Sequence, residues 1–202
     1  MVVGGWETFL TSDTHTARWF SLVLTEQNAP WAFWKGEPFK TIASLEMMAS
    51  LIALRVFGRQ AVWAGGNCSF GITSFTDNQS CGFVVDKLMT TSFPLCLVLI
   101  QLCDECERLG VFLDLSWIPR EQNVEADALT NGEFHNFDPS NRVEVSQELL
   151  GFDLLNELME FSSKLYLELE AGKKERASRP KVVLTKAAKV PVTKKLCWAQ
   201  PW

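Results

Sequence analysis

The sequence predicts an α/β fold in which a mixed sheet is flanked by helices. The first observation behind this prediction is that the spacing of apolar residues changes along the chain. Short stretches rich in β-forming residues alternate with longer stretches whose apolar residues recur at helical spacing. The second observation is the order of these stretches, which runs strands, helix, strand, helix, strand, helix. Such an order is typical of a sheet with helices packed against it.

The N-terminal part of the chain predicts strands. Residues 18–24 (RWFSLVL) are rich in β-forming side chains and predict one strand. Residues 31–34 predict another, because a turn signal, Asn-Ala-Pro, stands at 28–30. Residues 2–6 have the composition expected at the end of a further strand, in which two adjacent glycines allow another backbone to approach closely.

The segment that follows is strongly helical. Residues 41–57 predict a helix that ends at Gly58, and apolar residues cover most of its circumference. We therefore expect this helix to be largely buried. A carboxylate on such a helix is unusual, because a buried charge must be paired, neutralised or bound to a metal ion. Glu46 is therefore a candidate functional residue.

The remaining elements follow from the same signals. Residues 70–76 predict a strand that ends at Asp77, and residues 111–118 predict another strand. A proline begins the helix before the second of these strands, and Gly110 stops it. The predicted helices in this part of the chain are 80–90, 94–108, 121–130, 143–151 and 153–170.

Composition divides the chain into three parts: a domain at 1–132, a helical extension at 133–171 and a basic tail at 172–202. The tail holds nine Lys or Arg and one Glu, whereas the rest holds 10 basic and 23 acidic residues. An acidic body argues against tight nucleic-acid binding by the body itself. The tail could supply phosphate contacts or could be a solvated linker.

Several classes of protein are excluded by the sequence. No apolar run is long enough to predict a membrane span, and no signal peptide is expected at the N-terminus. The six cysteines have no framework spacing, which favours reduced thiols in an intracellular protein, cytoplasmic or nuclear. The pair Cys103 and Cys106 has no second pair to complete a zinc site, so we interpret both as helix and core residues.

Three acids stand out by their positions. Glu46 lies on the apolar helix, Asp77 at the C-terminal end of an apolar strand, and Asp127 on the helix after the last strand. Acids at strand ends and on facing helices can converge on one point, where like charges are stable only if cations neutralise them. Oxygen ligands favour Mg²⁺ or Mn²⁺. Two such ions activate water and stabilise the leaving oxygen in phosphodiester hydrolysis.

Each acid also has a structural interpretation. Asp77 could cap the helix that follows it, Glu46 could be an exposed helix residue, and Asp127 could pair with Arg120. Trp31 and Trp34, which have lysines nearby, could stack on bases or pack in the core.

Three motifs in order resemble the RNase H domain that follows reverse transcriptase in retroelements. The resemblance is nearest to the domain found in tyrosine-recombinase (DIRS-like) elements. The motifs are residues 42–49 (IASLEMMA), 75–79 (FTDNQ) and 117–130 (WIPREQNVEADALT). The last, a Pro turn followed by Asn-x-x-Ala-Asp-x-Leu, is the most specific of the three. The resemblance covers about residues 1–132 and implies an RNase H-like fold, a five-stranded mixed sheet with flanking helices.

The resemblance also implies a function. The family cleaves the RNA strand of RNA–DNA hybrids with two divalent metal ions, Mg²⁺ or Mn²⁺. By resemblance, Glu46, Asp77 and Asp127 are the metal ligands and catalytic residues, and the reverse transcriptase part of the same polyprotein is a further partner.

The sequence departs from the family pattern in two ways. The first catalytic Asp of the family precedes the Gly-Gly-aromatic segment, but here only three residues precede Gly4, so we expect an N-terminally truncated domain. Asp13 follows that segment and is not taken as the replacement. Many relatives also carry a His near the last active-site helix. His135 is the nearest counterpart here, and a surface-loop position is its other interpretation.

Two hypotheses of different classes follow. In the first, the chain is an RNase H-like endonuclease module that recognises a hybrid by its shape, phosphates and 2′-OH groups. In the second, it is a non-catalytic remnant that lacks one metal ligand and binds nucleic acid or a protein. A related exonuclease is less well supported, because an Asp-x-Glu in the first strand is not found.

Overall fold

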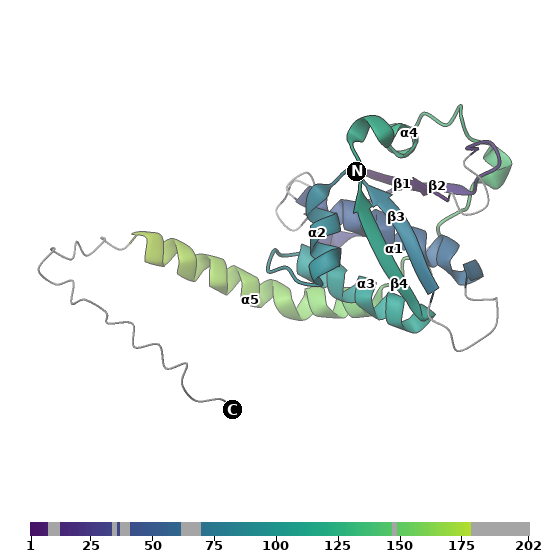
Figure 1. Cartoon of the computed structure of the whole chain (residues 1–202). Helices are drawn as coiled ribbons and strands as arrows, with labels where there is room; N and C mark the ends of the chain where they lie inside the picture. Colours follow the sequence, from purple (N-terminus) through teal and green to yellow (C-terminus); the bar gives the residue numbers. More distant parts are fainter. Residues whose placement is uncertain (8–12, 34–35, 37–40, 62–69, 147–148, 179–202) are drawn as a thin grey trace, which may run out of the picture. The chain divides into compact units, whose positions relative to one another are not determined.

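The computed structural model describes residues 1–7, 13–33, 36, 41–61, 70–146 and 149–178 (Figure 1). The chain divides into a compact unit, Met1–Ser163, and a second unit, Lys164–Trp202. Residues 133–163 therefore belong to the same unit as the strands. The described part of the second unit is the continuation of a helix that begins in the first.

The strands of the described chain form two ladders (Figure 1). β1 (Val2–Trp6) pairs antiparallel with β2 (Trp19–Val23), and β3 (Phe70–Thr76) pairs parallel with β4 (Val111–Trp117). The α/β class is thus confirmed. The described residues contain two sheets of two strands each, so a continuous five-stranded sheet is not seen in this part of the chain.

Helices pack around both ladders, and their ends follow from the sequence. Asn78 caps α2 by accepting hydrogen bonds from the amides of Ser80 and Cys81, and Gly110 ends α3 with a left-handed φ of 65°. The helices are α1 (Ile42–Ala61), α2 (Gln79–Lys87), α3 (Leu95–Leu109), α4 (Val124–Asn131) and α5 (Asp153–Ser178), with short 3-10 turns η1 (Pro30–Phe33), η4 (Arg120–Gln122) and η5 (Pro139–Asn141).

The core is built around α1, which contacts β1, β3, α2 and α3. Its side chains Met47, Met48, Leu51 and Ile52 are fully buried, as the apolar circumference of this helix predicts. Burial of each such side chain stabilises the fold by about 1.5–3 kcal/mol. The helix therefore forms a rigid base for the residues on its partly exposed side.

An ion-pair network centred on a buried carboxylate joins α1 and α3, and it also contacts the segment just before α5. Glu105, whose side chain is 1% exposed, pairs with both Arg55 and Arg108. Burial raises the pKa of Glu105, but the hydrogen bonds and charges of the two arginines outweigh it and hold the pKa below its ordinary value. The Arg55 guanidinium also lies 4.0 Å above the Phe152 ring. The predicted extension thus packs on the domain through Phe152 and the buried Leu155.

The strand predicted at residues 31–34 is wrong. Pro30–Phe33 forms the 3-10 turn η1, in which the Ala32 amide donates to the Ala29 carbonyl (3.0 Å). Trp31 is 1% exposed, so core packing is the interpretation confirmed for this side chain. The β-forming composition here reflects burial, not pairing. Trp34 lies outside the described residues.

The predicted helix end at Gly58 is also wrong, because α1 continues to Ala61. Gly58 is buried, and a Cβ there would come within 3.1 Å of a Leu54 methyl group and 3.5 Å of a Leu109 methyl group. The glycine therefore allows close packing between α1 and the end of α3. It does not terminate the helix.

The helix predicted at 143–151 is not present in its described part. Residues 143–146 are irregular, and the Val143 amide donates to the Trp19 carbonyl (2.7 Å). This contact and the bridge between Trp19 and Arg142 tie the segment to β2 in an extended conformation. Residues 147–148 lie outside the description. The tail predicted from residue 172 is helical as far as Ser178, and its remaining residues are not described.

Within the described ranges, every helix is too short or too polar to span a bilayer.

Candidate active site

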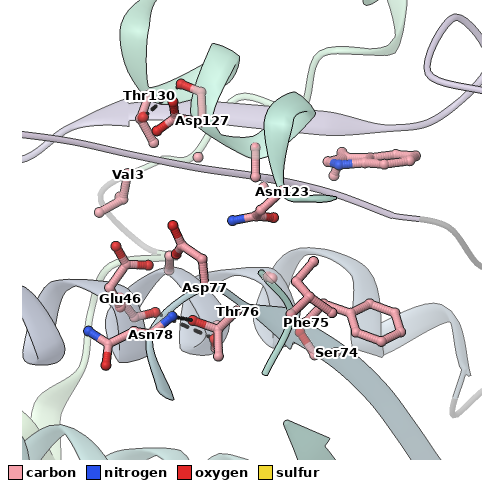
Figure 2. Close-up of a pocket in the computed structure, with 18 of the residues that line it drawn as sticks. Val3, Glu46, Ser74, Phe75, Thr76, Asp77, Asn78, Asn123, Asp127 and Thr130 are labelled. Carbon is pink, nitrogen blue, oxygen red and sulfur yellow. Dashed lines mark hydrogen bonds between the residues drawn. The ribbon is translucent and has the colours of Figure 1, made fainter. Parts of the chain in front are cut away.

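The three acids singled out in the sequence line one cavity of about 1310 Å³. Glu46 comes from the second turn of α1, Asp77 directly follows β3, and Asp127 lies in the first turn of α4. In Figure 2, Glu46 and Asp77 lie next to each other, and Asp127 lies on the α4 side of the cavity. The fold thus brings the predicted candidates to one place.

The position of Asp77 follows from the way β3 passes into α2. The carbonyl of Thr76 accepts a hydrogen bond from the Ile118 amide (2.9 Å), which continues the ladder to the end of β3. The next residue is therefore the first one free of the ladder. The Asn78 side chain, not that of Asp77, caps α2. The capping interpretation of Asp77 is therefore wrong, and its carboxylate remains available to the cavity.

Glu46 is only partly exposed, and its environment disfavours the charged form. The pKa of Glu46 is raised to about 7. Burial is the largest cause, the nearby charges of Asp77 and Asp127 also raise the pKa, and the charge of Arg120 lowers it. The interpretation of Glu46 as an ordinary exposed residue is not supported. A bound cation would offset the repulsion between these carboxyl groups and would stabilise the ionised form of Glu46.

Arg120 supplies the positive charge of the site. Its Nη2 lies 2.9 Å from Oδ1 of Asp127, so the pairing considered for these two residues is confirmed. The Arg120 side chain is 71% exposed. Its pKa is raised first by the hydrogen bond to Asp127, and by the charges of Asp77 and Glu46 as well. The sequence predicts Arg120 only as a partner of Asp127. Its position beside the Pro turn could also have indicated a residue of the site.

Polar neutral side chains complete the lining. Asn78, Asn123 and Thr130 face the same cavity (Figure 2). Thr130 also donates its hydroxyl hydrogen to the main-chain carbonyl of Asp127 (2.8 Å), which holds this turn of α4 together. These three residues lie within the recognised motifs, yet sequence reasoning assigned them no role.

The donor chemistry fits a hard divalent cation, because three carboxylates offer the oxygen ligands that Mg²⁺ and Mn²⁺ prefer. As the described side chains stand, no three Asp, Glu, His or Cys groups are close enough together to hold a metal ion. Asp127 is held by Arg120, so it would have to exchange this partner for the ion.

The histidines and the Cys103–Cys106 pair do not line the cavity. His15 and His135 are exposed and do not line the cavity, so the surface-loop interpretation of His135 fits. Cys103 and Cys106 are free thiols on α3. Burial, followed by the charge of Glu46, raises the pKa of Cys81 to about 12, so this thiol stays neutral beside the acids.

Fold and site together define an α/β protein with a cavity whose lining includes Glu46, Asp77 and Asp127 among other acids. No known protein family, curated protein or solved structure matches this chain.

Proposed function

We propose that this chain is an RNase H-like endonuclease module of a retroelement polyprotein that hydrolyses the RNA strand of RNA–DNA hybrids. The observation that carries the proposal is the meeting of Glu46, Asp77 and Asp127 in one cavity, from three elements far apart in sequence. The same three residues are the metal ligands that the family resemblance implies. The cavity geometry and the family resemblance therefore point to the same three residues.

In this proposal, Glu46, Asp77 and Asp127 hold Mg²⁺ or Mn²⁺. The bound ions supply an activated water and neutralise charge on the leaving oxygen. A cation held there would favour the ionised form of Glu46, whose pKa is raised first by burial and then by the charges of Asp77 and Asp127. With Asp127 as a ligand of the ion, the Arg120 guanidinium would be available to a phosphate of the substrate.

The substrate is a hybrid duplex recognised by its backbone and its 2′-OH groups. Asn78, Asn123 and Thr130 offer amide and hydroxyl groups at the cavity for such contacts. The overall charge of −5 makes broad electrostatic attraction weak, so the reverse transcriptase part of a polyprotein is the proposed partner that would hold the hybrid nearby.

The test is cleavage of a hybrid whose RNA strand carries a 5′ fluorophore, followed on denaturing gels in Mg²⁺, in Mn²⁺ and in EDTA. The variant is Asp77→Asn, and the matched control is Asp86→Asn, an exposed carboxylate on α2 outside the cavity. We expect cation-dependent cleavage of RNA in the hybrid only. Asp77→Asn should reduce it by at least about 100-fold, since loss of an outer-shell partner alone costs 10–100-fold.

Asp86→Asn should cleave like the unaltered chain. Absence of cleavage by the folded chain in both cations, or equal cleavage by Asp77→Asn, would exclude the nuclease proposal.

The Arg120–Asp127 ion pair favours a second candidate function, a non-catalytic RNase H-like module that binds nucleic acid. In that case Arg120 keeps Asp127 from binding a cation. The same hybrid would then bind without being cleaved, and Arg120→Gln would weaken that binding. Fluorescence anisotropy of the labelled hybrid in EDTA measures this directly.

A further inference from the structure

Phe75 is an aromatic side chain that its neighbours leave uncovered. It lies on β3, lines the cavity and is 52% exposed. Residues that face each other across two paired strands point to the same side of a sheet, and Ser116 of β4 faces Phe75. Thr73, two residues earlier on β3, points to that side as well. Both neighbours are small and polar, which leaves the ring open to the cavity.

Exposure alone does not indicate a binding site, because the side chains of Phe83 and Phe112 are 64% and 76% exposed. These two rings lie outside the cavity lining. Phe75 differs from them by its position two residues before Asp77, about 7 Å along an extended chain. An open aromatic ring therefore lies beside the acids of the candidate active site.

Asn123 brings an amide group to the same cavity. It holds the N-cap position of α4, where an Asn side chain usually accepts a hydrogen bond from the first turn of the helix. The Asn123 side chain makes no such bond, because its backbone (φ −108°, ψ 27°) is not in the extended conformation typical of a cap. Asn78, with a ψ of 100°, has that conformation and does cap α2.

The Asn123 amide therefore remains available to the cavity. In Figure 2 it extends from α4 toward the end of β3, the strand that carries Phe75. The main chain of Asn123 is held in place, because its carbonyl accepts a hydrogen bond from the Asp127 amide (3.0 Å). Asn123 thus offers a hydrogen-bond donor and an acceptor from a fixed backbone position.

An aromatic face and an amide are two groups with which proteins hold an unpaired nucleobase. The base stacks on the ring, and its edge forms hydrogen bonds with polar side chains. An Asn amide presents a donor and an acceptor side by side, which matches N7 and the N6 amino group of adenine. Adenine is therefore the base that these two side chains fit best.

The nucleotide that carries this base has to be unpaired. In an intact duplex the neighbouring base pairs cover both faces of a base, so the base cannot stack on Phe75. The backbone of the nucleotide would also pass the acids. Arg120, which lines the same cavity and is 71% exposed, supplies a positive charge for its phosphate. These features favour a single-stranded ligand over a paired one.

We propose that Phe75 and Asn123 form a binding site for one unpaired adenine base, which stacks on the ring and forms hydrogen bonds with the amide. The site lies next to the acids, but base binding requires no hydrolysis. It adds single-stranded nucleic acid to the ligands of the cavity and does not rest on the nuclease proposal. Binding and cleavage are measured separately, so either proposal can fail without the other.

The probes are single-stranded DNA pentanucleotides labelled with fluorescein, which an enzyme specific for RNA in hybrids does not cleave. TTATT has one central adenine, TTTTT has thymine in its place, and a third strand lacks the central base but keeps the backbone. Each strand is titrated with the full chain and followed by fluorescence anisotropy. The buffer contains Mg²⁺, which screens the negative charge of the acids.

We expect saturable binding of TTATT, at least about tenfold tighter than binding of the strand without the central base, because only a base can stack on the ring. TTTTT should bind at least about threefold more weakly than TTATT, because thymine does not match the amide in the same way. Absence of saturable binding of TTATT, or equal binding with and without the central base, would overturn the proposal.

A pair of substitutions locates the stacked base. Phe75→Leu keeps an apolar side chain but removes the ring, and Phe83→Leu makes the same change on α2 outside the cavity. Phe75→Leu should weaken binding of TTATT at least about fivefold, and Phe83→Leu should leave it unchanged. Both side chains are largely exposed, so both variants should fold, which circular dichroism verifies. Equal binding by the two variants would contradict the assignment of Phe75.

A second pair tests the amide. Asn123→Ala removes the amide without removing a capping bond, and Asn156→Ala makes the same change at an exposed position of α5 outside the cavity. Asn123→Ala should bind TTATT and TTTTT equally, whereas Asn156→Ala should keep the preference for adenine. A preference for adenine that survives in Asn123→Ala would overturn the role of Asn123.

Discussion

Glu46 is the residue at which burial and charge act in the same direction. It lies on a helix whose neighbouring side chains Leu45 and Met47 are buried, and it faces the carboxylate of Asp77. The ionised form is therefore disfavoured in the folded protein relative to the unfolded chain. Retaining such a group lowers stability near neutral pH unless a cation is present.

Glu46→Gln should therefore stabilise the metal-free protein in a pH-dependent way. The pKa of Glu46 is about 7 in the folded chain against an ordinary value of 4.5. The folded state binds the extra proton between these values, so this group lowers stability as pH rises from 4.5 through 7. The variant should gain up to about 2 kcal/mol by pH 8 after allowance for solvent screening, and little at pH 5.

Urea unfolding in EDTA at pH 5, 6, 7 and 8 measures this difference. Glu107→Gln, which removes an exposed carboxylate on α3, is the control. A stability difference between Glu46→Gln and the unaltered chain that stays constant over this pH range would show that Glu46 is not held in its neutral form.

At the scale of elements, glycines decide how closely β1 approaches α4. A Cβ at Gly4 would lie 2.8 Å from the Cβ of Leu129, which is fully buried. The polar cavity wall contributed by α4 therefore depends on a strand that lacks a side chain at this point. The close backbone approach predicted for the two glycines of β1 is confirmed at Gly4.

Gly4→Ala should destabilise the protein by about 1–3 kcal/mol, because the added methyl group overpacks the contact with Leu129. Gly71→Ala on β3 is the matched control. Nothing lies within 4 Å of a Cβ at Gly71, so its effect should stay within about 0.5 kcal/mol. Thermal unfolding of the two variants decides the matter, and equal melting temperatures would show that β1 does not approach α4 as closely as described.

Local signals predicted most elements, because they act over a few residues. The strand before Asp77 and the αL stop at Gly110 are examples. The errors came from tertiary contacts that local patterns do not contain. Val143 pairs with Trp19, which lies far away in sequence, and Gly58 is small because Leu109 packs against its helix. Strand partners are equally non-local, so the sequence alone did not predict two separate ladders.

The sequence predicted the acids of the site but not the interactions that they make. An acid on an apolar helix and an acid at a strand end are visible in one sequence, and both line the cavity. The competition of Arg120 with a cation for Asp127 is a matter of geometry. The sequence could name that pair as an alternative, but it could not choose between the two partners.

At the scale of the whole molecule, the compact unit reaches Ser163 and includes most of the predicted helical extension. Phe137, Phe152 and Leu155 are each at most 3% exposed. The indole nitrogen of Trp19 donates to the Asp138 carbonyl (2.8 Å). The region after residue 132 therefore covers part of the core that the strands leave open.

Two truncated chains test which of these regions the fold requires. A chain of residues 1–163 should unfold cooperatively with a melting temperature within a few degrees of that of the full chain. A chain of residues 1–132 loses three buried side chains worth about 1.5–3 kcal/mol each, comparable to the whole stability of a domain. It should therefore lack a cooperative transition. Cooperative unfolding of 1–132 in calorimetry would instead establish the boundary predicted from composition.

The central claim is that Glu46, Asp77 and Asp127 form one site for a divalent cation. The most direct test is Mn²⁺ binding by electron paramagnetic resonance, in the unaltered chain, Asp77→Asn and the exposed control Asp86→Asn. We predict saturable binding that Asp77→Asn weakens at least about tenfold and that Asp86→Asn leaves unchanged. Absence of saturable binding, or equal binding by all three proteins, would contradict the claim.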